Sequence, residues 1–235
     1  MDLSAVFTIE GLDLIIIKII NGVCESCEGD IPDASFNISG DFLTILKMLI
    51  GELNFLNVYF SEQIEVDGEL NHLYLFAEVL EISLKILNLE KKEDPLITLE
   101  LSDMRELLRV YYAGAEHLEG VHVPKFFKLL EMFMNLNPEA QEEVEEMDML
   151  LKITVTDVGD YYLQVVDKKF SWSQEPNKNA ELEIAMSLHT LAELITQEDD
   201  SVAAYMAGKI TVKGDLTQAL ALQEFITMCL DFLDL

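Results

Sequence analysis

The sequence is poor in basic residues, and this scarcity excludes whole classes of partner. Its 15 lysine and arginine residues face 44 acidic residues, which gives a formal net charge of −29, and no segment of the chain is basic. Proteins hold the nucleic-acid backbone through clustered lysine and arginine, so we expect no nucleic-acid partner. Anionic membrane surfaces should repel the chain for the same reason.

Cysteine and long apolar runs are also scarce. Three cysteines, an odd number, argue against a framework of disulfide bonds. The longest apolar run, residues 14–20, contains Lys18 and is far shorter than a membrane-spanning helix requires. The first residues show no secretory signal pattern. We therefore expect a cytoplasmic protein that does not insert stably into a membrane.

Sequence motifs for catalysis or metal binding are few. Cys24 and Cys27 form a CxxC pair, but a zinc site needs four ligands, and the chain has no second CxxC and no close histidine pair. The four histidines stand apart and are expected on the surface. No glycine-rich phosphate loop and no GxSxG motif occurs. We expect a protein that is not an enzyme and that uses no metal or cofactor.

The most informative pattern lies in residues 205–235. Ile210 and Val212 alternate with polar residues, as in a half-buried strand. Gly214 ends this strand at a point where a backbone with positive φ is useful, and Asp215 is placed to cap the helix that follows. The apolar arc of that helix is wider than a helix on one sheet requires. A second helix, another protein surface or an apolar ligand must cover the remainder.

Within this stretch, residues 204–223 (AYMAGKITVKGDLTQALALQ) resemble the signature of the sterol-carrier-protein family, also called non-specific lipid-transfer proteins. The matching residues are Gly208, Lys209, Ile210, Val212, Lys213, Gly214, Asp215, Ala219, Leu222 and Gln223. The resemblance covers about the last hundred residues. It implies an α+β fold that binds a fatty acid, acyl-CoA or sterol-like lipid in an apolar tunnel between sheet and helices, without a reaction.

The chain also resembles itself. A shift of 146 residues, without a gap, lays residues 64–70 on 210–216 and places Asp41 on Ser187, two residue types that cap helices. Chance does not keep one register over so long a stretch. The sequence therefore predicts two copies of one domain in tandem.

The first copy departs from the family signature. Glu62 and Gln63 stand where the second copy has its Gly-Lys pair, and Ala77 stands where it has Gln223. These changes bring the ligand chemistry of the first copy into doubt more than its fold. We expect a degenerate first domain in residues 1–90, a helical connector in 91–136 and a second domain in 137–235. Each domain should hold a five-stranded, mainly antiparallel sheet covered by helices.

We place the ligand site in the second copy, on inward-facing strand and helix residues. The predicted ligand-binding residues are Trp172, Leu182, Ile184, Leu191, Leu194, Tyr205, Met206, Ile210, Val212, Leu220, Gln223 and Phe225. Gln223 can hydrogen-bond a lipid head group, whereas Ala77 cannot, so the second copy should bind better. Trp172 is either core or pocket wall. The competing hypothesis is a scaffold or dimerisation module whose side chains fill both tunnels, with a protein partner or self-association in place of a lipid.

Overall fold

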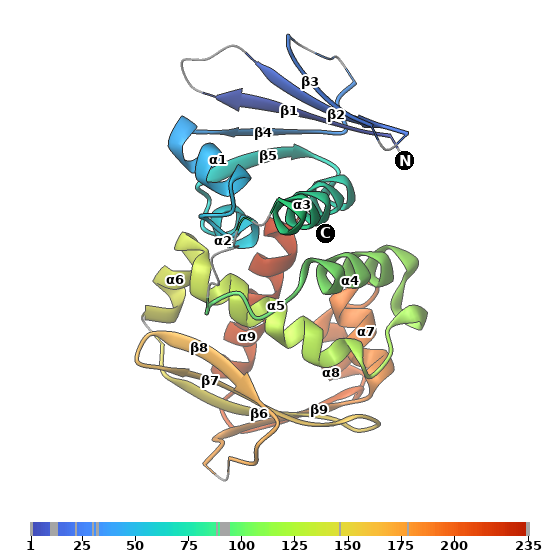
Figure 1. The fold of residues 1–235 in the computed structure, drawn as a ribbon. Coiled ribbons are helices and arrows are strands. Elements are labelled where there is room, and N and C mark those ends of the chain that lie inside the picture. Colours follow the sequence, from blue (N-terminus) through green and yellow to red (C-terminus); the bar gives the residue numbers. More distant parts are fainter. Residues whose placement is uncertain are drawn as a thin grey trace. The chain divides into compact units, whose positions relative to one another are not determined.

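A computed structural model describes residues 2–9, 14–21, 23–29, 31, 33–87, 89, 95–145, 147–177 and 179–233. The chain forms two compact units, Met1–Arg105 and Glu106–Leu235, called here the first and the second unit. In each unit helices lie on one face of a five-stranded sheet (Figure 1), so the predicted α+β class is confirmed. Within the described ranges, no helix is long and apolar enough to cross a membrane.

The first unit joins five strands and three helices. Its elements are β1 (Leu3–Ile9), β2 (Ile15–Ile20), β3 (Val23–Glu28), β4 (Phe36–Gly40), α1 (Phe42–Leu49), α2 (Phe55–Phe60), β5 (Ile64–Gly68) and α3 (Leu70–Ile86). The strand order is β3-β2-β1-β4-β5. β1 and β4 run parallel, and the other neighbouring strands of this sheet run antiparallel.

The second unit repeats this plan and adds helices before its first strand. Helix α4 (Leu101–Ala113) spans the boundary between the units. The elements that follow are η1 (Ala115–His117), α5 (His122–Leu136), α6 (Pro138–Glu145), β6 (Met149–Val155), β7 (Gly159–Val166), β8 (Lys169–Ser173), β9 (Leu182–Met186), α7 (Leu188–Ile195), α8 (Ser201–Met206), β10 (Ile210–Lys213) and α9 (Leu216–Phe232). The strand order is β10-β9-β6-β7-β8.

The two sheets share one topology. Read from the opposite edge, the second sheet has the same strand order as the first, and its parallel pair is again the first and fourth strands of the unit. The register also agrees at the shift of 146 residues, because Ala5 pairs with Phe36 and Leu151 with Leu182. Helices α1, α2 and α3 have the bounds of α7, α8 and α9 at the same shift. The two sheets therefore agree in strand order, as two copies of one domain require.

Side-chain caps start the matched helices α1 and α7. Asp41 Oδ1 accepts hydrogen bonds from the backbone N–H groups of Leu43 at 2.9 Å and Thr44 at 3.1 Å. Ser187 Oγ accepts one from the N–H of Thr190 at 3.1 Å. Hydrogen bonds from Thr44 lower the pKa of Asp41, so the capping carboxylate stays ionised. Each cap satisfies donors that the first turn of a helix leaves without partners.

In each unit, one glycine with positive φ ends the last strand, as the sequence predicts. Gly68 has φ +124° and Gly214 has φ +119°. A Cβ atom added at Gly214 would lie 2.4 Å from the carbonyl oxygen of Glu181, and one at Gly68 would lie 2.7 Å from the Cα atom of Phe36. Only glycine allows the chain to pass this close to the neighbouring strand.

Helix α5, which lies in the segment expected to form a separate connector (residues 91–136), packs within the second unit. The predicted boundary at residue 90 lies in 90–94, outside the described residues. Helix α5, however, packs on β8 within the second unit, where the ring centroid of Phe127 lies 5.1 Å from that of Tyr161 and 6.0 Å from that of Trp172. The compact second unit therefore begins well before residue 137, since α5 buries its apolar face against this sheet.

The structure places the cysteine pair on an exposed edge strand and buries one of the four histidines. Cys24 and Cys27 are free and exposed on the edge strand β3, where a separation of three residues puts them on opposite faces. In the part of the chain that the structure describes, no group of side chains could hold a metal ion. The expected surface position is wrong for His122, which is 6% exposed. Its Nδ1 accepts a hydrogen bond from the N–H of Glu119 at 2.9 Å, and its Nε2 lies 3.1 Å from Glu106 Oε1.

Candidate ligand cavity

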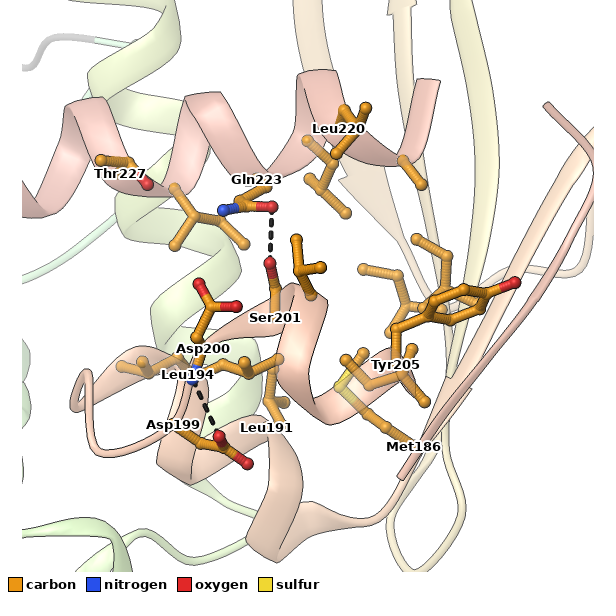
Figure 2. Close-up of a pocket in the computed structure, with 18 of the residues that line it drawn as sticks. Met186, Leu191, Leu194, Asp199, Asp200, Ser201, Tyr205, Leu220, Gln223 and Thr227 are labelled. Atoms are coloured by element: carbon orange, nitrogen blue, oxygen red, sulfur yellow. Dashed lines mark hydrogen bonds between the residues drawn. The ribbon is translucent and has the colours of Figure 1, made fainter. Parts of the chain in front are cut away.

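A cavity of about 540 Å³ lies between the sheet and the helices of the second unit. Strands β9 and β10 and helices α7, α8 and α9 supply most of its wall, and β6 and α5 supply one residue each (Figure 2). The wall is predominantly apolar. Sites of 300–1,000 Å³ with apolar walls and a few polar groups are the usual form of small-molecule sites.

One stripe of helix α9 faces the cavity. Leu216, Leu220, Gln223 and Thr227 follow one another at intervals of four, three and four residues, which puts them on one side of a helix. The helix begins at a cap, because Asp215 Oδ1 accepts a hydrogen bond from the N–H of Thr217 at 2.8 Å. The cap fixes the first residue of α9 relative to β10, and so determines that these four side chains face the sheet.

Part of the apolar wall is open to solvent. Leu220 is 48% exposed and Val202 is 54% exposed, although both line the cavity. Apolar surface left in contact with water is unfavourable, and a contiguous apolar surface of this kind marks a site for a ligand or partner. The cavity therefore has an accessible apolar mouth between α8 and α9.

Polar groups gather at one end of the cavity. Figure 2 shows Asp199, Asp200, Gln223 and Thr227 on one side, with Leu191 and Leu194 beside the two aspartates, and Leu220, Tyr205 and Met186 on the other. Ser201 Oγ donates a hydrogen bond to Gln223 Oε1 at 2.5 Å. This bond engages the amide oxygen of Gln223, and the two N–H donors of the same amide take no part in it.

The loop between α7 and α8 makes the polar end acidic. Asp200 Oδ1 accepts a hydrogen bond from the N–H of Ala203 at 2.9 Å and so caps α8. Asp199 Oδ2 lies 2.8 Å from Lys209 Nζ, a contact that lowers the pKa of Asp199 and raises the pKa of Lys209. Both groups therefore remain ionised near neutral pH.

The comparison with family models concerns the part of the chain that holds this cavity. Residues 128–227 match the model of the SCP-2 sterol transfer family. The resemblance predicted for the last hundred residues is therefore confirmed. The matched range contains all five strands of the second unit and most of the cavity wall. A comparison with curated proteins gives no match.

Several solved structures resemble part of the chain. The sec-alkylsulfatase Pisa1 from Pseudomonas sp. is 22% identical with a TM-score of 0.36, over 43% of this chain and 15% of that protein. The ubiquinone synthesis protein UbiJ-SCP2 is 15% identical with a TM-score of 0.39, over 45% of this chain and 93% of that protein. The sterol carrier protein domain 2 of Helicoverpa armigera is 18% identical with a TM-score of 0.38, over 47% and 87%.

The structure brings eight of the twelve predicted site residues together in the cavity wall. They are Ile184, Leu191, Leu194, Tyr205, Ile210, Val212, Leu220 and Gln223. They come from β9, β10 and the three helices α7, α8 and α9. Their contact with a ligand stays a prediction, but their common location is a fact of the fold.

The other four predicted residues lie outside the wall. Trp172 is half-buried on the edge strand β8, with its ring centroid 6.0 Å from that of Phe127 and 6.2 Å from that of Tyr161. Met206 is 79% exposed at the end of α8. The buried residues Leu182 and Phe225 serve the core between sheet and helices. Facing inward from a strand or helix therefore does not by itself bring a side chain to the cavity.

Sequence reasoning missed other wall residues. Leu216 and Thr227 lie four residues from Leu220 and Gln223, so helical spacing could have found them. Phe127 was missed because it belongs to a helix that we assigned to the connector. The acidic loop, residues 197–200, carries no periodic pattern that would have placed it at the cavity.

Proposed function

We propose that the second unit binds a hydrophobic small molecule non-covalently in the cavity and holds or carries it without a reaction. The observation that carries the proposal is the apolar wall that remains open to solvent at Leu220 and Val202. Covering such surface gains roughly 25 cal/mol per Å². The match of residues 128–227 to a family named for sterol transfer supports the same class of ligand.

The expected affinity follows from the length of the ligand's hydrocarbon chain that the cavity can cover. Burying about ten methylene groups at ~0.8 kcal/mol each gives a gross gain of about 8 kcal/mol. Association and ordering costs reduce this figure, so we expect micromolar binding at best. Such an affinity suits a carrier that must release its ligand.

The proposal treats the first unit as a degenerate copy of the same domain. The shared strand order, register and helix bounds support this origin. Ala77 occupies the position of Gln223 and offers no side-chain group to a ligand head. We therefore assign the better binding site to the second unit.

A scaffold role for the first unit has an observation of its own in its favour. The ring centroid of Phe76 lies 5.8 Å from that of Phe7 and 5.5 Å from that of Phe36. These aromatic rings fill space between sheet and helix α3, as the competing hypothesis expects. The first unit in this proposal stabilises the chain or contacts a protein partner, and the second unit holds the ligand.

A cytoplasmic location is part of the same proposal. Cys24 and Cys27 are free and exposed, which suits a reducing compartment. The net charge of −29 makes tight binding to an anionic membrane unfavourable. Exchange of ligand through solution or through brief contacts with a neutral surface fits this charge.

A titration with pyrene-labelled decanol tests the proposal. The parent protein should bind the probe in the micromolar range, and Leu220→Trp should weaken binding by about tenfold or more because the indole blocks the cavity. The matched control Val166→Trp adds the same bulk at an exposed residue outside the wall and should bind like the parent. No binding by the parent, or equal binding by the parent and Leu220→Trp, would contradict the proposal.

A further inference from the structure

We propose that the cavity selects an amphiphile with an uncharged hydroxyl or amide head group and disfavours carboxylate and phosphate head groups. This inference rests on the function proposed above and specifies its ligand. Three consecutive acidic residues, Glu198, Asp199 and Asp200, line the polar end, and among the described residues none of those in the wall is a lysine, arginine or histidine.

The negative charges at the polar end are built into the fold. Glu198 Oε1 accepts a hydrogen bond from the N–H of Ala115 at 2.6 Å, and Asp200 caps α8 through the N–H of Ala203. The donor in each bond is a neutral backbone N–H group, so neither bond brings a positive side chain to the polar end.

Lys209, a cation beside the acidic loop, is already shared between two carboxylates. Its Nζ lies 2.8 Å from Asp199 Oδ2 and 3.0 Å from Glu193 Oε2, and His189 Nε2 lies 3.4 Å from Glu193 Oε1. The ammonium group of Lys209 is therefore already engaged by carboxylates of the protein. A ligand carboxylate at the polar end would lose water without gaining a positive partner, which is unfavourable.

Neutral hydrogen-bonding groups remain available at the same end. Gln223 presents an amide, while Ser201 and Thr227 carry hydroxyl groups in the wall. The bond from Ser201 to Gln223 holds the amide in a fixed orientation toward the cavity (Figure 2). An amide and hydroxyls donate and accept without charge, and this suits a hydroxyl or amide on the ligand.

Two probes that differ only in the head group test the inference. Pyrene-labelled decanol should bind the parent at least about tenfold more tightly than pyrene-labelled decanoic acid at pH 7.5, where the acid is ionised. Equal binding of both probes, or tighter binding of the acid, overturns the inference and leaves the proposed function standing. Absence of binding by either probe defeats the proposed function itself.

A charge-neutralising variant locates the cause. The double variant Glu198→Gln with Asp200→Asn removes two charges but keeps the oxygen acceptors, and asparagine caps helices as well as aspartate does. It should reduce the preference for the alcohol severalfold. The control Glu139→Gln with Glu142→Gln removes two exposed charges on α6 and should leave the preference unchanged. A preference that survives the first variant, or that falls equally in the control, overturns the inference.

Discussion

The two units share one topology but fill the space between sheet and helices differently. In the second unit Leu220 is 48% exposed beside an open cavity. Its counterpart in the first unit, Tyr74, is fully buried, with its ring centroid 6.4 Å from that of Tyr59. Ser201 of the cavity wall is likewise replaced by the buried residue Phe55.

This difference shows that the topology of a unit and the packing of its interior depend on different residues. Strand register, helix caps and the glycines at positive φ agree between the units, and they fix where each element lies. The volume of a few helix side chains then decides whether the interior is packed or hollow. A fold of this kind can lose a pocket by substitutions such as leucine to tyrosine without losing its architecture.

The far edges of the two sheets, β3 and β8, differ in the opposite sense, because here the second unit has the larger side chains. In the second unit Phe170 of β8 is buried and Trp172 is half-buried, and α5 lies against this strand. At the matched positions of β3 the first unit has Cys24 and Ser26, which are small and exposed. The first unit has therefore adapted this edge to solvent, where the second has covered it.

The largest predicted effect is a contrast in stability between Tyr74→Ala and Leu220→Ala. Tyr74→Ala should cost about 3–5 kcal/mol, because it empties a packed interior. Leu220→Ala should cost less than about 1 kcal/mol, because its side chain already meets solvent and the cavity. Urea unfolding measures both, with Trp172, the single tryptophan, reporting on the second unit and circular dichroism on the whole chain. Similar costs would contradict the contrast between packed and hollow interiors.

Two glycines of the second unit, Gly214 after strand β10 and Gly208 before it, predict a second, smaller contrast in stability. Gly214→Ala should destabilise by more than about 2 kcal/mol, since it adds steric overlap with Glu181 to the strain of positive φ. Gly208→Ala should cost only about 1 kcal/mol, because a Cβ at Gly208, with φ +73°, meets nothing within 4 Å. Thermal melting of both variants checks the order, and a harmless Gly214→Ala would refute the close approach.

A substitution in the first unit should give the smallest effect and the opposite sign. Glu62 stands where the second unit has Gly208, and it keeps the left-handed backbone with φ +55°. Glu62→Gly should stabilise the protein by about 0.5 kcal/mol, because relief of strain exceeds the added freedom of the unfolded chain. Glu65→Gly, within strand β5, should destabilise instead. A rise in stability for Glu65→Gly or a loss for Glu62→Gly would contradict this account.

Much of the fold could be predicted from local patterns in the sequence. Alternation at Ile210 and Val212, the capping residues Asp41 and Ser187, and the ungapped self-similarity each depend on neighbours in the chain, so one sequence contains them. The extent of the second unit could not be predicted in this way, because the packing of α5 on β8 is a contact between residues far apart in the sequence. The apolar pattern of α5 fits a connector and a core helix equally well.

The candidate site was predictable only in part, for a related reason. Strand and helix periodicity indicates which side chains face inward, and eight such residues do line the cavity. Periodicity does not indicate where inward-facing side chains meet and where they leave space. Phe225 and Leu182 are buried in contact with the core, whereas Leu220 borders the open space. The acidic end depends on a loop whose position follows from α7 and α8 together.

Photo-crosslinking with a diazirine-bearing long-chain alcohol, followed by peptide mapping, tests the central contrast between the units most directly. The account predicts labels in α7, α8 and α9, which line the cavity, and few in the matched helices α1, α2 and α3. Leu220→Trp should abolish the specific labels, while Val166→Trp should keep them. Equal labelling of the two sets of helices, or labelling that Leu220→Trp leaves unchanged, would contradict the account.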